Sequence, residues 1–167
     1  MKHILPLLFL FLSTLSFAQA RFVGYTAEAP AATAPMKFTE QHHAVIAQAN
    51  YLMDMPADKD VEKRAEAARF VANWIKSSND VDLNLEDKLM PYLQYNEALA
   101  IFMGSYAQFS LTHPTTDHVA ANIAGMYSVV SYYLDNKETL GFDVLLEKLV
   151  DMRDSGRLRG FIKRRIG

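Results

Sequence analysis

Residues 95–134 decide the fold of this chain, and they read YNEALAIFMGSYAQFSLTHPTTDHVAANIAGMYSVVSYYL. Within this range, two long stretches carry no Asp, Glu, Lys or Arg: residues 98–116 and residues 119–134. In each stretch apolar side chains recur at three- and four-residue spacing, which is typical of an α-helix. Because the first stretch is apolar almost all round, it predicts a helix at the centre of a domain.

The turn between these stretches predicts an antiparallel helical hairpin. Residues 113–116 contain the proline that ends one helix and the threonines that we expect to cap the next. The predicted helices cover about 95–111 and 117–134. Gly104 and Gly125 lie at mirror-image positions about the turn, and a glycine inside a helix costs about 1 kcal/mol relative to alanine. We therefore expect the two backbones to approach closely at these glycines.

Two helical patterns precede the hairpin. Thr39 is a suitable N-cap for a helix that ends before Pro56, and a second helix opens near Asp58. Asp60 and Arg64 have the spacing of an i,i+4 ion pair, which we place on the outer face of the second helix. The buried stripe that we expect for that helix consists of Val61, Ala65, Ala68, Ala72 and Ile75, widened by Phe70, Val71 and Trp74.

The remaining patterns complete an all-α prediction. Before the hairpin, Asn84 is placed to cap a short helix that Pro91 breaks. After it, an apolar stripe from Phe142 to Met152 predicts a helix that ends at Gly156, and residues 157–166 form a basic C-terminal helix. We therefore predict a bundle-like, all-α domain of five to six helices around the central antiparallel hairpin.

The first twenty residues have the three parts of a secretory signal peptide. Lys2 gives a positive start, an apolar run follows over residues 4–12, and Ala18-Gln19-Ala20 is the small-x-small pattern that signal peptidases cut. The expected organisation is a cleaved signal peptide (1–20), a flexible leader (21–38) and a single helical domain (39–167).

The chain contains no cysteine. It therefore cannot form disulfides, carry a lipid on a cysteine, bind c-type haem covalently or hold zinc through thiolates. The two uncharged stretches contain hydroxyl and amide groups, and residues 119–134 are fewer than the about 20 that a spanning helix needs. We therefore expect an exported protein, periplasmic or secreted, that is not a lipoprotein and has no transmembrane span.

Charge is distributed unevenly along the chain. Residues 21–151 contain 10 Lys and Arg against 18 Asp and Glu, whereas residues 152–167 contain six against one. The acidic body argues against a nucleic acid partner. The basic tail either docks on that body or makes a peripheral contact with an anionic membrane, and its short apolar stripe favours docking. The interaction residues that we assign to it are Arg157, Arg159, Lys163, Arg164 and Arg165.

No motif indicates catalysis or metal binding. The chain has no G-x-S-x-G, no phosphate-binding glycine loop and no H-E-x-x-H. The Glu-x-x-His step at Glu40 and His43 occurs once, whereas a di-iron bundle needs it twice. We therefore expect no metal, no cofactor and no catalytic residue.

Tyrosines gather on the hairpin, where they suit either a core or a ligand pocket with Glu97 as its one charge. The candidate ligand-binding residues are Tyr95, Glu97, Tyr106, Tyr127 and Tyr133. The leading prediction is a non-enzymatic, exported binding or interaction module with an unknown protein or small-molecule partner. The alternative is a small-ligand carrier or an enzyme that uses this pocket or the turn from His113 to His118.

Overall fold

The computed structural model describes residues 38–94, 97–113 and 117–166. The predicted signal peptide and all but the last residue of the predicted leader lie outside these ranges. The described residues are all-α, as predicted, and contain no strand. Their helices are α1 (Glu40–Asp54), α2 (Val61–Ser77), the 3-10 turn η1 (Met90–Tyr92), α3 (Ala98–Thr112), α4 (His118–Asp135), α5 (Lys137–Leu140), α6 (Val144–Asp154) and α7 (Leu158–Ile166).

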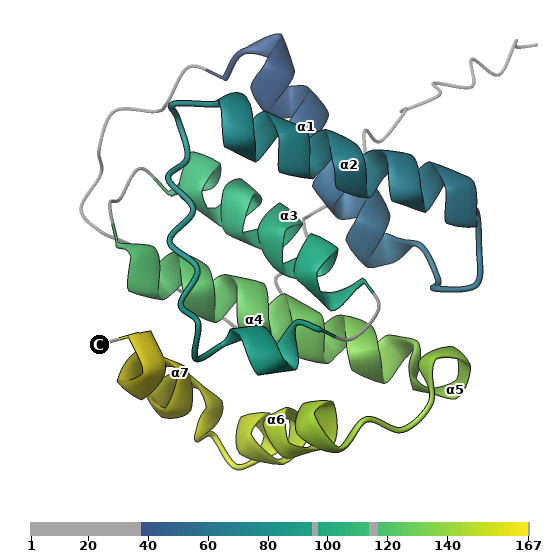
Figure 1. Ribbon diagram of the computed structural model, residues 1–167, viewed down its shortest axis with the longest axis vertical. Coiled ribbons are helices and arrows are strands. Elements are labelled where there is room, and N and C mark those ends of the chain that lie inside the picture. Colours follow the sequence, from purple (N-terminus) through teal and green to yellow (C-terminus); the bar gives the residue numbers. More distant parts are fainter. Residues whose placement is uncertain (1–37, 95–96, 114–116, 167) are drawn as a thin grey trace, which may run out of the picture.

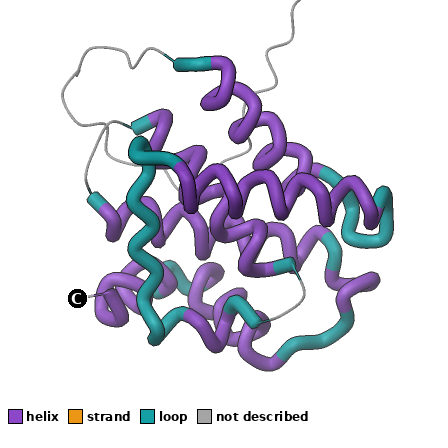
Figure 2. Tube along the Cα trace, turned by 45° about the horizontal axis from the view of Figure 1, so that its top comes forward, coloured by secondary structure: helices purple, strands orange, loops and turns teal. Residues whose placement is uncertain are grey.

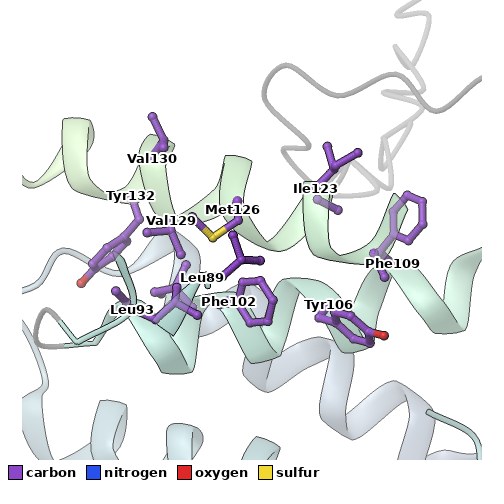
Figure 3. Packing of buried hydrophobic residues seen from close by; sticks show 14 of the residues in the cluster. Leu89, Leu93, Phe102, Tyr106, Phe109, Ile123, Met126, Val129, Val130 and Tyr132 are labelled. Carbon is purple, nitrogen blue, oxygen red and sulfur yellow. The ribbon is translucent and has the colours of Figure 1, made fainter. Parts of the chain in front are cut away.

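Helices α3 and α4 form the predicted central hairpin (Figure 1). Helices α1 and α2 pack on α3, whereas α6 and α7 pack on α4, so the hairpin is covered on both sides. Phe102 of α3 lies beside Met126 of α4 and Leu89 in the hydrophobic core (Figure 3). Within the described ranges, no helix has both the length and the apolar content that crossing a bilayer requires.

The two glycines of the hairpin serve different contacts. A Cβ atom on Gly104 would lie 3.2 Å from the Cβ of Ala49, so this glycine lets α1 approach α3. A Cβ atom on Gly125 would lie 2.6 Å from Cδ2 of the Phe102 ring, so this glycine makes room for a side chain of α3. The hairpin contact that we predict for Gly104 is therefore wrong, whereas Gly125 does act within the hairpin.

We expect Gly125→Ala to lower the free energy of unfolding by about 1–3 kcal/mol, despite the better helix propensity of alanine. The added methyl group overlaps the ring of Phe102, which is fully buried. Equilibrium unfolding in urea measures the loss. Gly104→Ala is the matched control and should change stability less, because its methyl group meets Ala49 at a longer distance. Equal losses of stability in the two variants would contradict a specific overlap between residue 125 and the ring of Phe102.

Helix α2 turns a different face to the core from the one predicted. Arg64 is fully buried, whereas Val61 is 62 % exposed. Arg64 pairs with Glu97 and not with Asp60, so the predicted surface ion pair is wrong. Asp60 instead occupies the N-cap position of α2. The stripe that we predict for α2 lies on the wrong side of the helix, because the prediction places Arg64 at the surface. The residues of α2 that are buried are Arg64, Ala67, Val71, Trp74 and Ile75.

The helix starts are set by local hydrogen bonds. Thr39 caps α1 as predicted: its Oγ1 accepts from the His42 N–H, and its own N–H donates to Nδ1 of His42. Asp117 takes the N-cap position of α4 that we assign to a threonine, and it accepts from two N–H groups of the first turn. Phe142 precedes α6 and is 75 % exposed, so its predicted place in the buried stripe is wrong.

Residues 78–86, which we call the extended segment, are not helical (Figure 2), and residues 87–89 form a turn that leads into η1. The short helix that we expect after Asn84 is therefore wrong. The N–H of Asn84 donates to the Tyr106 hydroxyl at 3.3 Å, and its carbonyl accepts from Nδ2 of Asn122 at 2.9 Å. The side chains of α3 and α4 thus pair with backbone groups of the extended segment.

Candidate functional site

A buried cation, Arg64, lies where four helices meet. Its Nη1 donates to the carbonyls of Leu52 at 3.2 Å and Met55 at 2.6 Å, at the end of α1. Its Nε lies 3.0 Å from both carboxylate oxygens of Glu97. Its Nη2 donates to Glu97 and, at 2.6 Å, to the hydroxyl of Tyr132. All three guanidinium nitrogens therefore have partners, and the group joins α1, α2, α4 and the start of α3.

The surroundings of Arg64 keep it charged. Burial by itself lowers the pKa of the guanidinium, but the hydrogen bonds and charge of Glu97 together with Tyr132 outweigh this effect and raise it. Burial is also the main cause that raises the pKa of Tyr132, against the opposing charge of Arg64. Both groups hold their protons at neutral pH, so the cluster is suited to joining helices and not to proton transfer.

Sequence reasoning missed Arg64 and Tyr132 as partners of Glu97. A signal was present, because Arg64 continues the three- and four-residue spacing of Ala67 and Val71 on α2. An arginine on an apolar stripe is normally placed at the surface, since an unpaired buried charge is strongly unfavourable. Its burial depends on residues that are distant in sequence.

The hydroxyl of Tyr106 joins α3 to the extended segment and to α4. It donates to the Asp82 carbonyl at 2.9 Å and accepts from the Asn84 N–H. It also lies 3.0 Å from Nδ1 of His118. The one hydroxyl group therefore links the carbonyl of Asp82, the N–H of Asn84 and the imidazole of His118.

The hydroxyl of Tyr133 faces α6 at the other end of the hairpin. It donates to Oε1 of Glu147 at 2.5 Å, and Nζ of Lys137 lies 2.5 Å from the same oxygen. The hydrogen bond from Lys137 is the largest cause that holds the pKa of Glu147 below its ordinary value of 4.5, followed by that from Tyr133. Glu147 therefore favours its charged form in the folded chain.

We expect Glu147→Gln to lose a stabilising contribution at neutral pH. Because the pKa of Glu147 is lower in the folded than in the unfolded chain, that contribution is fully present above about pH 4.5 and is lost as the pH falls through the folded value. Urea unfolding from about pH 7 down to about pH 3 should show the difference in stability between parent and variant shrinking. A difference that is constant with pH would rule out this role.

The candidate ligand residues are distributed among separate contacts. Glu97 pairs with Arg64 and Tyr132, Tyr106 with His118, and Tyr133 with Glu147. Tyr106 and Tyr132 lie at opposite ends of the hairpin interior (Figure 3). Tyr127 is half-buried on α4, and Tyr95 lies outside the described residues. Among the described candidates, Glu97, Tyr106 and Tyr133 therefore belong to three separate contacts.

Two surface grooves lie apart from the candidate ligand residues. One, of about 590 Å³, runs between α1 and α2, and another, of about 580 Å³, lies between α2 and the extended segment. Neither is lined by Glu97 or by any of the candidate tyrosines. Among the described side chains, no three of the His, Asp or Glu type converge so that they could hold a metal ion.

Helix α7 docks on the body through its apolar side, as its short apolar stripe predicts. Leu158, Phe161 and Ile162 are buried, and α7 contacts α4 and α6. Arg165 also points inward: its guanidinium lies 4.4 Å from the ring centre of Phe161 and 5.4 Å from that of Tyr92. The other four predicted interaction residues are exposed and form what we call the basic face: Arg157, Arg159, Lys163 and Arg164.

The exposed cations of the basic face differ in their contacts. Lys163 and Arg164 make no ion pair with any residue that the structure describes, and Arg157 donates to the hydroxyl of Ser155. This face is the candidate functional site. No protein-family model, no curated protein and no solved structure matches this chain, so the assignment rests on this geometry.

Proposed function

We propose that this chain is an exported helical binding module, periplasmic or secreted, that contacts a negatively charged partner through the basic face. One observation carries the proposal. Four cationic side chains are exposed on and directly before α7, while the apolar side of the same helix is already buried in the body. The cations are therefore presented on a fixed surface and not on a free tail.

The docking of α7 favours an acidic macromolecule over a membrane. Interfacial helices bind membranes by burying their apolar face among the lipids. Leu158, Phe161 and Ile162 are instead buried in the protein, so insertion would require α7 to leave the body. Charge alone contributes about 1 kcal/mol per Lys or Arg near an anionic leaflet, which gives weak attachment for four side chains.

The test compares two pairs of neutralised cations. We expect Lys163→Gln/Arg164→Gln to weaken binding of the purified chain to poly-L-glutamate by about tenfold at low salt, because two cations leave the contact. Arg69→Gln/Lys76→Gln is the matched control, since both side chains are exposed on α2, away from α7. Isothermal titration calorimetry measures both.

Equal binding by the two variants would contradict the proposal. Vesicles of phosphatidylglycerol and phosphatidylcholine supply the second probe. Binding to these vesicles without binding to poly-L-glutamate would overturn the choice of an acidic macromolecule and favour a membrane.

A further inference from the structure

An acidic end lies opposite the basic face. We define it as residues 54–63 and 135–147, which contain eight carboxylates against three lysines, a net charge of −5. The two segments are adjacent, because the Ala57 N–H donates to Oδ1 of Asn136 at 2.7 Å. The turn between α1 and α2 and helix α5 lie on one side of the molecule, and α7 lies on the other (Figure 1).

The carboxylates of the acidic end are available to a partner. Six of the eight are exposed: Asp54, Asp58, Asp60, Glu62, Asp135 and Glu138. Glu62 and Glu138 make no ion pair within the described part of the chain. Residues 152–167, which include α7, carry a net charge of +5, so the two ends are complementary in sign and similar in size.

The acidic end also exposes apolar side chains. Among the described residues, five large apolar side chains are exposed, and three of them belong to this end: Val61 at 62 %, Phe142 at 75 % and Val144 at 68 %. Exposed apolar groups bordered by charge are typical of a protein interface. The long aliphatic stems of the arginines and lysine on the basic face can cover such groups while their charged ends meet carboxylates.

We infer that the acidic end of one copy of this chain binds the basic face of a second copy, head to tail. The inference rests on the proposed function, because it names the negatively charged partner of the same face. Each copy would use two different surfaces, so the contact is heterologous and can repeat along a row of molecules. Because the contact depends on exposed charges, it should weaken as salt is added.

Two neutralised variants test the contact. Lys163→Gln/Arg164→Gln changes the basic face, and Glu62→Gln/Glu138→Gln changes the acidic end. In sedimentation velocity at low salt, we expect the parent chain to associate as its concentration rises and to dissociate when salt is added. Each variant alone should associate at least about tenfold more weakly, a loss of about 1.4 kcal/mol.

An equimolar mixture of the two variants gives the decisive result. The intact basic face of one variant can still bind the intact acidic end of the other, so the mixture should form one-to-one dimers and nothing larger. A parent chain that stays monomeric at every concentration, or a mixture that fails to dimerise, would overturn the inference. If the chain stays monomeric while Lys163→Gln/Arg164→Gln still weakens binding to poly-L-glutamate, the proposed function stands and only the second copy is rejected.

Discussion

Replacing Arg64 by methionine is expected to lower the free energy of unfolding by about 3–5 kcal/mol. The variant leaves the Glu97 carboxylate without its cation, and the carbonyls of Leu52 and Met55 lose a donor. Because 30 % of the Glu97 side chain is exposed, water compensates part of the loss, and the expected value lies toward the lower end. Urea unfolding followed by circular dichroism at 222 nm, the standard helix signal, measures it.

Three further variants separate charge from geometry at Arg64. Arg64→Lys retains the charge but presents one nitrogen, so it should recover only part of the stability. Tyr132→Phe removes one hydroxyl contact and should cost about 1 kcal/mol. Adding Glu97→Gln to Arg64→Met removes the unpaired charge, so the double variant should be more stable than Arg64→Met alone. A loss below about 1 kcal/mol for Arg64→Met would show that the cluster does not hold the helices together.

The second large effect concerns the docking of α7. We expect Ile162→Ala to lower the free energy of unfolding by about 2–4 kcal/mol, because this side chain is fully buried between α7 and the body. The neighbouring Lys163→Gln is the matched control and should stay within about 0.5 kcal/mol of the parent, since its side chain is exposed. The same urea unfolding measurement compares the two.

The two variants of α7 also distinguish stability from binding. Ile162→Ala should reduce stability, whereas the substitutions on the basic face should reduce binding to poly-L-glutamate and leave stability nearly unchanged. If Ile162→Ala had no effect on stability, α7 would not be docked in solution, and its apolar side would be available to a membrane.

The parts of the fold that the sequence predicts correctly depend on residues that are close to one another in the chain. The central hairpin follows from two uncharged helical stretches around a turn, and the cap of α1 follows from Thr39. The docking of α7 follows from an apolar stripe too short for a membrane. In each case the residues that decide the outcome lie within a few helical turns of one another.

Three of the wrong predictions share one cause. The segment around Asn84 is extended because Tyr106 and Asn122 hold its backbone, and the face of α2 depends on Glu97. Gly104 accommodates α1, not α4. Each outcome depends on a partner on another element, which periodicity along the chain does not identify.

Local spacing and composition are enough to predict that the described residues are helical, that α3 and α4 form a hairpin and that residues 152–167 are basic. The burial of Arg64 and the placement of the basic face opposite the acidic end depend instead on contacts between elements that are distant in the sequence. Burying a guanidinium is favourable only with hydrogen-bond partners, and those of Arg64 lie up to 68 residues away.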